Sequence, residues 1–217
     1  MIVDLHLKGG LVIVVGAGAE GQKKVKSLLT QDCKILVVSR EFGPRMEEYA
    51  LDGRVRLQQS SLEDAGFLSG YAPRVVMATT DDRDLNREIV SKARAAGCLA
   101  YASDDPESSD FAHPSVINIE DTVQVAVSTG GRSPAMARKI RQEAERIFRS
   151  TIKREDILQI RLQDSMRGEA KKRIGSQEGR KKYMYSIIND DRIMQLIRDD
   201  RLDMARERAA VMLDGWR

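Results

Sequence analysis

The sequence predicts an α/β protein with a Rossmann-like, doubly wound parallel sheet. The first reason is the run Leu11 to Val15, which is branched and apolar without a polar interruption and is typical of a strand buried on both faces. The second is that strand-like and helix-like segments alternate regularly as far as residue 105. This alternation is typical of parallel strands joined by crossover helices.

A glycine motif follows the first strand and predicts a dinucleotide site. Gly16 permits the tight turn, Gly18 lets the backbone approach a pyrophosphate, and Gly21 lets the next helix pack closely on the strand. Ala19 and Glu20 begin that helix, whose free N–H groups favour an anion. Because the motif lies between a strand and an amphipathic helical pattern, we favour this hypothesis over a glycine-rich turn without a ligand.

The next elements of the first half can be read from their patterns. We expect strands at residues 34–39, 55–59, 74–80 and 99–103, and helices at residues 20–29, 44–52, 62–68 (a short turn) and from about 83 to 96. At the end of the second strand, where an acid often binds the ribose, the chain has Ser39 and Arg40. Arg40 is suited to a 2′-phosphate, which leaves NADP open, or it is a solvated loop charge.

Polar residues follow the fourth strand, at the edge where α/β sheets bind ligands. Thr79, Thr80 and Asn86 are therefore expected to line the cofactor cleft. A simpler account makes Asp82 or Asp84 an N-cap. That account explains the acids but not the two threonines.

From residue 113 the pattern changes. Two alternating strands at residues 116–119 and 122–128 lead into Ser128, Gly130, Gly131, Arg132 and Ser133, where Ser133 is expected to cap a helix that runs to 149. The glycines and the helix N-terminus suit a carboxylate or phosphate, and the alternative is a plain strand-to-helix connection. Further helices are expected at residues 152–166, 180–188, 193–197 and 202–213.

Composition narrows the class of protein. The net charge is +3, and its basic surplus lies after residue 150. Aromatic residues make up only 5%, which does not favour a nucleic-acid binder. No apolar run is long enough for a membrane span and no leader pattern is present, so we expect a cytoplasmic protein. Cys33, Cys98 and the lone His113 show no metal-ligand spacing, and we expect no metal site.

Three phrases in this order carry a family resemblance. They are Ala78-Thr79-Thr80-Asp81-Asp82 with Leu85-Asn86, Asp104-Asp105-Pro106 with Asp110-Phe111 and Pro114-Ser115, and the run from Val125 to Pro134 with Ala137-Arg138. Over residues 1–149 the chain resembles the siroheme synthase N-terminal family, the precorrin-2 dehydrogenases. This family includes bifunctional dehydrogenase–ferrochelatases.

The resemblance implies oxidation of the tetrapyrrole precorrin-2 to sirohydrochlorin in siroheme biosynthesis, with NAD as the hydride acceptor. It also implies a homodimer. The chain then divides into three parts: residues 1–113 bind NAD, residues 114–149 form the dimer contact, and residues 150–217 form a helical domain. It also implies that Asp104 is the general base. From the residues alone, Asp104-Asp105-Pro106 could equally be a turn whose acids accept local N–H bonds.

Other hypotheses remain open at this point. Arg132 and Arg138 are candidate anchors for substrate carboxylates, together with the loop from Ser128 to Ser133. Iron insertion as a second activity is undecided. A nucleotide-sensing regulatory module shares the glycine motif and the Thr-Asp-Asp phrase, but it leaves the run from Ser128 to Pro134 unexplained. A generic oxidoreductase is weakened because no Tyr-xxx-Lys pair is evident.

Overall fold

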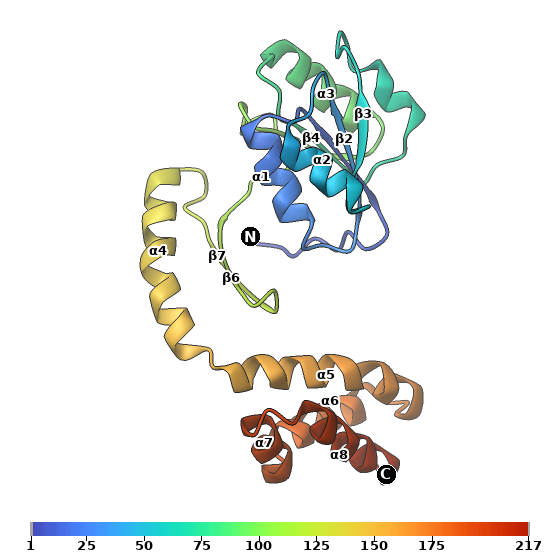
Figure 1. Ribbon diagram of the computed structural model, residues 1–217, viewed down its shortest axis with the longest axis vertical. Coiled ribbons are helices and arrows are strands. Elements are labelled where there is room, and N and C mark those ends of the chain that lie inside the picture. Colours follow the sequence, from blue (N-terminus) through green and yellow to red (C-terminus); the bar gives the residue numbers. More distant parts are fainter. Residues whose placement is uncertain (1, 217) are drawn as a thin grey trace. The chain divides into compact units, whose positions relative to one another are not determined.

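The computed structural model describes residues 2–216, and the chain divides into two compact units between Pro114 and Ser115 (Figure 1). The first unit contains a five-stranded parallel sheet in the order β3-β2-β1-β4-β5. Its strands are β1 (Leu11–Val15), β2 (Lys34–Ser39), β3 (Arg56–Gln59), β4 (Val75–Ala78) and β5 (Leu99–Ala102). The strand order reverses beside β1, which puts a crevice at the carboxyl ends of β1 and β4.

Helices connect these strands and cover both faces of the sheet. They are α1 (Ala19–Leu28), α2 (Pro44–Leu51), the 3₁₀ helix η1 (Gly66–Gly70) and α3 (Arg83–Ala95). The predicted doubly wound α/β class is confirmed. The short turn expected at residues 62–68 was placed too early, because Leu62 has a positive φ of 53° and the helical geometry begins at Gly66.

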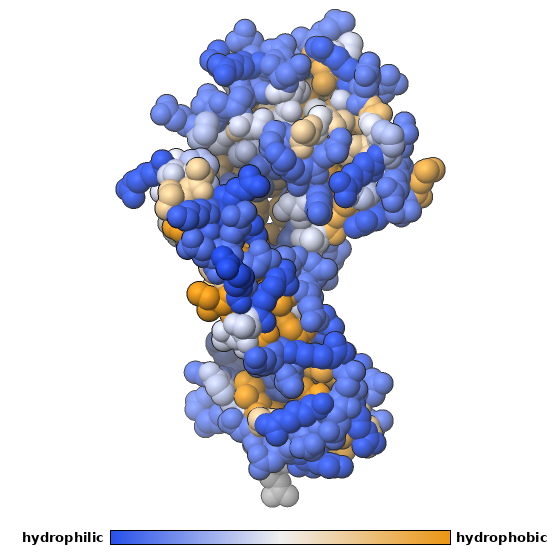
Figure 2. All heavy atoms as spheres, turned by 60° about the vertical axis from the view of Figure 1, so that its left-hand side comes forward, coloured by the Kyte–Doolittle hydropathy of each residue, from blue (hydrophilic) through white to orange (hydrophobic). Residues whose placement is uncertain are grey.

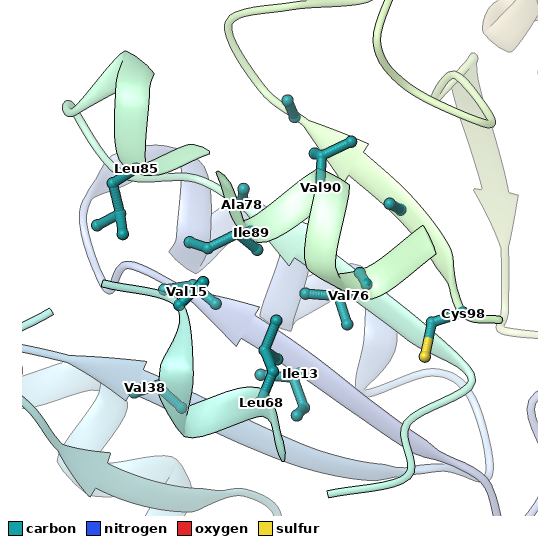
Figure 3. Packing of buried hydrophobic residues seen from close by; sticks show 14 of the residues in the cluster. Ile13, Val15, Val38, Leu68, Val76, Ala78, Leu85, Ile89, Val90 and Cys98 are labelled. Atoms are coloured by element: carbon teal, nitrogen blue, oxygen red, sulfur yellow. The ribbon is translucent and has the colours of Figure 1, made fainter. Parts of the chain in front are cut away.

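Two apolar clusters lie on opposite faces of the sheet because successive side chains of a strand alternate in direction. Ile13 and Val15 of β1 pack with Leu85 and Ile89 of α3 on one face (Figure 3). Val12 and Val14 pack with residues of α1 and α2 on the other face. All four of these β1 side chains have an exposed fraction of 0%. The sheet is therefore a rigid base for the loops at its carboxyl edge.

The second unit begins with a hairpin and continues as helices. Strands β6 (Ser115–Ile119) and β7 (Val123–Val127) pair antiparallel, and the turn places Glu120 and Asp121 at positive φ. The helices are α4 (Pro134–Thr151), α5 (Arg154–Arg173), α6 (Gln177–Ile188), α7 (Asp191–Arg198) and α8 (Leu202–Asp214). The last four share an apolar cluster, in which the buried Tyr183 hydroxyl donates to the carbonyl oxygen of Ala209 at 2.7 Å.

Two helix boundaries in this unit differ from expectation by more than two residues. Helix α5 runs seven residues past the expected end at 166 and includes Gly168, since tertiary packing of Ala170 offsets the weak helix propensity of glycine. Helix α6 begins before the expected residue 180. The Ser176 hydroxyl accepts a hydrogen bond from the N–H of Gly179 at 3.0 Å and so forms the N-cap of α6. This cap was not predicted, because Ser176 lies in a polar segment that resembles a connector.

Within residues 2–216, no helix is long and apolar enough to cross a membrane. The same residues hold no group of three His, Cys, Asp or Glu side chains that could bind a metal ion. Cys33 and Cys98 are free thiols.

Candidate functional site

The glycine motif forms a tight loop between β1 and α1. Gly16 has a φ of +101°, and a Cβ atom there would lie 2.9 Å from the carbonyl oxygen of Thr79. A Cβ at Gly21 would lie 2.0 Å from the carbonyl oxygen of Gly16. In contrast, a Cβ at Gly18 would meet no atom within 4 Å. The first and third glycines therefore permit close packing, and the second leaves open space at the N-terminus of α1.

A cavity of about 780 Å³ opens at this loop. Most of the predicted cofactor residues line it: Gly16, Gly18, Ala19, Glu20, Ser39, Arg40, Thr79 and Thr80. Gly21 and Asn86 do not line it. This space lies at the carboxyl edge of the parallel strands, beside a helix N-terminus, where the backbone N–H groups and the helix dipole favour a pyrophosphate. The residues present therefore fit a dinucleotide.

The end of β2 shapes one side of this cavity. The buried Ser39 hydroxyl accepts a hydrogen bond from the N–H of Ala17 at 3.3 Å, which ties β2 to the glycine loop. Arg40 is exposed, and its Nε donates to the carbonyl oxygen of Ser61 at 2.8 Å. Arg40 thus lies along the cavity and is held by the neighbouring loop. It occupies the position directly after β2, and the acid Glu41, which also lines the cavity, follows it.

The end of β4 supplies two threonines with different roles. Thr79 is buried, and its hydroxyl donates to the carbonyl oxygen of Val15 at 2.8 Å, so it braces the glycine loop. Thr80 is half-buried, and its hydroxyl lies 2.7 Å from Oδ1 of Asn86. The Asp82 carboxylate caps α3 by accepting from the N–H groups of Asp84 and Leu85. Asp82 is therefore the N-cap of α3. The two threonines do not cap this helix: Thr79 bonds to Val15 and Thr80 bonds to Asn86.

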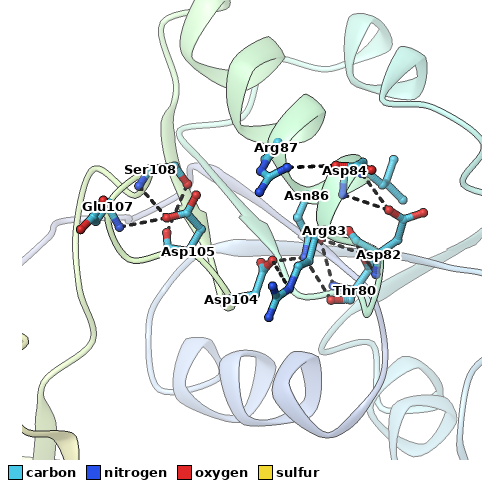
Figure 4. Close-up of polar contacts among 11 residues, drawn as sticks. Thr80, Asp82, Arg83, Asp84, Asn86, Arg87, Asp104, Asp105, Glu107 and Ser108 are labelled. Carbon is cyan, nitrogen blue, oxygen red and sulfur yellow. Dashed lines mark hydrogen bonds and ion pairs between the residues drawn. The ribbon is translucent and has the colours of Figure 1, made fainter.

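Asn86 connects the end of β4 with the residue after β5. It is 1% exposed, and its Nδ2 donates to the carbonyl oxygen of Thr80 at 3.0 Å and to Oδ1 of Asp104 at 2.9 Å (Figure 4). The Asp104 side chain is 22% exposed, and Arg83 Nε lies 3.9 Å from its other oxygen. Asn86 thus holds one carboxylate oxygen of Asp104, the other oxygen faces Arg83, and the side chain as a whole is partly exposed.

The structure separates the two neighbouring acids. Asp105 accepts hydrogen bonds from the N–H groups of Glu107 and Ser108, both at 3.2 Å, and the Ser108 N–H in particular lowers the pKa of Asp105. The turn interpretation therefore describes Asp105. Asp104 instead points toward Asn86 on α3, as Figure 4 shows. Of the two acids, Asp105 is thus bound within its own turn, and Asp104 is bound to α3.

The predicted substrate residues lie in the second unit, in the loop between β7 and α4. Gly130 and Gly131 have φ values of 62° and 79°, which favour glycine. The Ser128 hydroxyl accepts from the N–H of Gly130 at 3.1 Å. The Ser133 hydroxyl accepts from the N–H of Met136 at 3.3 Å and forms the expected N-cap.

The two arginines of this loop and helix are available for an anion. Arg132 and Arg138 are exposed, and within residues 2–216 neither side chain forms an ion pair within 4.0 Å. Both cations thus lie close to the N-terminus of α4, where the helix dipole also favours a negative charge.

Several lining residues were not anticipated from the sequence. Ser103 lies directly before Asp104 at the end of β5, and Gln22, Phe42 and Leu62 also line the cavity. The position of Ser103 directly after a parallel strand could have predicted that it lines the cavity. Leu62 and Phe42 gave none, because apolar loop residues reach the cavity only through the tertiary fold.

Comparison with known proteins agrees with this geometry. A family model described as putative NAD(P)-binding matches residues 3–115, and one described as sirohaem biosynthesis protein central matches residues 121–146. The chain belongs to the siroheme synthase N-terminal family. Dinucleotide binding at the glycine loop thereby gains support that is independent of the cavity.

Relatives in this family include longer proteins. Siroheme synthases of Nitrosococcus oceani and Gluconobacter oxydans are each 34% identical over 143 and 145 residues, which cover 66% of this chain and 30% of each relative. The chain thus spans about 30% of the length of these relatives. A solved structure of SirC, precorrin-2 dehydrogenase, has a TM-score of 0.63 at 18% identity and covers 97% of this chain and 98% of its own. The two proteins share a fold across both units.

The open space at Gly18 leads to a test of the cofactor site. Gly18→Leu should fill that space and raise the Kd for NAD by about tenfold to a hundredfold, the equivalent of losing a hydrogen bond to a charged group. Equilibrium titration would measure this. Gly70→Leu is the matched control, because Gly70 also faces open space but lies in η1. An unchanged Kd in Gly18→Leu would contradict the assignment of the loop.

Proposed function

We propose that this protein oxidises precorrin-2 to sirohydrochlorin, with NAD as the hydride acceptor and Asp104 as the general base. The observation that carries the proposal is the placement of Asp104. Its carboxylate is fixed by Asn86 at the carboxyl edge of the sheet, just after β5, the neighbour of β4, and the residues that follow β4 line the dinucleotide cavity. Family membership supports the choice of substrate.

The chemistry of the reaction matches these residues. Dehydrogenation of a reduced tetrapyrrole removes a hydride and a proton, so a site needs a hydride acceptor and a base. NAD supplies the hydride acceptor when it is bound. The Oδ2 atom of Asp104, which faces the exposed Arg83 side chain, takes the proton, and the Asn86 amide holds Oδ1 so that the carboxylate keeps one orientation.

Membership of the family supports NAD as the hydride acceptor. Arg40 does not discriminate between NAD and NADP, because only its Nε is engaged, by the carbonyl oxygen of Ser61, and its terminal N–H groups remain able to bind a phosphate. The loop from Ser128 to Ser133, with Arg132 and Arg138, is proposed to bind carboxylates of the substrate, because an exposed guanidinium can form paired hydrogen bonds with a carboxylate.

A homodimer formed by residues 114–149 is also part of this proposal. Met136, Ile140 and Ile147 follow one side of α4 at helical spacing and are 47%, 42% and 64% exposed. Hydrophobic areas are visible between the hydrophilic side chains that cover most of the surface (Figure 2). A second copy of the same helix would bury such a stripe. The two free thiols suit a reducing compartment, so we place the reaction in the cytoplasm.

An anaerobic absorbance assay tests the function directly. Purified protein with precorrin-2 should produce the sirohydrochlorin spectrum with NAD and much more slowly with NADP. Addition of ferrous ion then tests iron insertion as a second activity. A protein that binds dinucleotide but oxidises no precorrin-2 with either cofactor would instead support a nucleotide-sensing module.

The role of Asp104 has a matched control in its neighbour. Asp104→Asn removes the base and should lower kcat by at least about a hundredfold, with the Kd for NAD unchanged because Asp104 does not line the cavity. Asp105→Asn should keep near-wild-type kcat, since Asp105 serves only its own turn. Near-wild-type turnover in Asp104→Asn would remove Asp104 from the mechanism.

The dimer is tested by sedimentation. The wild-type protein should sediment at about twice 24.3 kDa, and Ile140→Glu should shift it toward the monomer because a charge would be buried in the apolar contact. Gln142→Glu adds the same charge on the opposite side of α4 and should leave the dimer intact. A wild-type monomer would refute the proposed contact.

A further inference from the structure

Four polar or charged residues are buried in the described chain, and one of them has no polar partner. Ser39, Thr79 and Asn86 are hydrogen-bonded parts of the candidate site. The fourth is Lys24 of α1, which is 9% exposed. Within residues 2–216, its ammonium group makes no hydrogen bond and has no carboxylate oxygen within 4.0 Å. The Lys24 side chain is mostly buried, but its Nζ atom is not among the fully enclosed side-chain atoms that lack a partner, so the ammonium keeps access to the surface.

The contact that Lys24 does make is aromatic. Its Nζ lies 4.4 Å from the centroid of the Tyr101 ring on β5. Tyr101 in turn packs against Phe111 and His113, with ring centroids 5.6 Å and 4.9 Å away. A cation–π contact contributes about 0.5–2 kcal/mol, which offsets only part of the desolvation. Burial lowers the pKa of Lys24 to about 8, so the group is still mostly charged at neutral pH.

Lys24 and Tyr101 flank the candidate site. Lys24 follows Glu20, a lining residue of the dinucleotide cavity, by one turn of α1. Tyr101 and Ser103 are two residues apart, which puts both side chains on the same face of the sheet, and Ser103 lines the cavity. Asp104 is the next residue. The cation and the three rings therefore lie beside the edge of the site where the proposed base is held.

We propose that Lys24 binds a carboxylate of the tetrapyrrole substrate, and that Tyr101, Phe111 and His113 form the apolar surface beside it. This inference rests on the proposed function, because the substrate class defines the ligand. A polycarboxylate with a broad ring system matches a cation that lies over one aromatic ring, with two further rings packed against that ring. The dinucleotide fits this point less well, because its pyrophosphate is served by the N–H groups at the start of α1, a full turn away.

Steady-state kinetics with three variants test the inference. Lys24→Gln should raise the KM for precorrin-2 by about tenfold or more, the equivalent of one lost charge-assisted hydrogen bond. Its kcat and its Kd for NAD should stay within about twofold of wild type. Lys24→Arg should recover most of the KM. Lys26→Gln is the control, since Lys26 carries the same charge on the same helix and is exposed.

A second measurement uses the wild-type protein and so avoids any folding defect. Acylation of lysines, followed by mass spectrometry, should show that sirohydrochlorin protects Lys24 more than Lys26. An unchanged KM in Lys24→Gln, equal protection of both lysines, or a loss of NAD binding together with precorrin-2 binding would each overturn the inference. If the wild-type protein oxidises no precorrin-2, the proposed function fails. If it does and Lys24→Gln behaves as wild type, only the inference about Lys24 fails.

Discussion

At the crossing of β1 and α1 there is no room for a side chain. A Cβ at Gly21 would lie 2.0 Å from the carbonyl oxygen of Gly16, and a Cβ at Gly16 would lie within 3.0 Å of Thr79. This close approach brings the start of α1 against the ends of β1 and β4. The cavity of about 780 Å³, the open space at Gly18 and the orientation of the helix N-terminus all depend on it.

A second constraint passes from β4 to β5 through Asn86. One buried amide holds both Thr80 and Asp104, and so it couples the end of β4 to the proposed base. Two adjacent acids of the same chemistry thereby acquire different partners: Asp105 accepts hydrogen bonds within its own turn, whereas Asp104 contacts Asn86 and Arg83 of α3. The two acids have different partners because their side chains, although adjacent in the sequence, point to different sides of the chain.

The buried polar and charged groups of the first unit differ in the partners that they contact. The buried hydroxyls and the buried amide are paired with backbone or side-chain groups, whereas the Lys24 ammonium faces an aromatic ring. Hydrogen-bonded polar groups stabilise the loop arrangement, whereas the Lys24 ammonium is stabilised by its contact with the Tyr101 ring. In the second unit the candidate anion-binding groups are exposed instead: Arg132 and Arg138 lie near the start of α4.

Local patterns in the sequence determined the sheet, the glycine loop, the caps at Asp82 and Ser133, and the family. These features depend on residues close together in the chain, where strand alternation, glycine conformation and capping act directly. Only the tertiary structure decided which of Asp104 and Asp105 contacts α3, that Gly21 and Asn86 support the site from outside the cavity, and that Lys24 lies over Tyr101. Residues 77 positions apart meet through strand order and packing, and sequence spacing alone carries no information about such a contact.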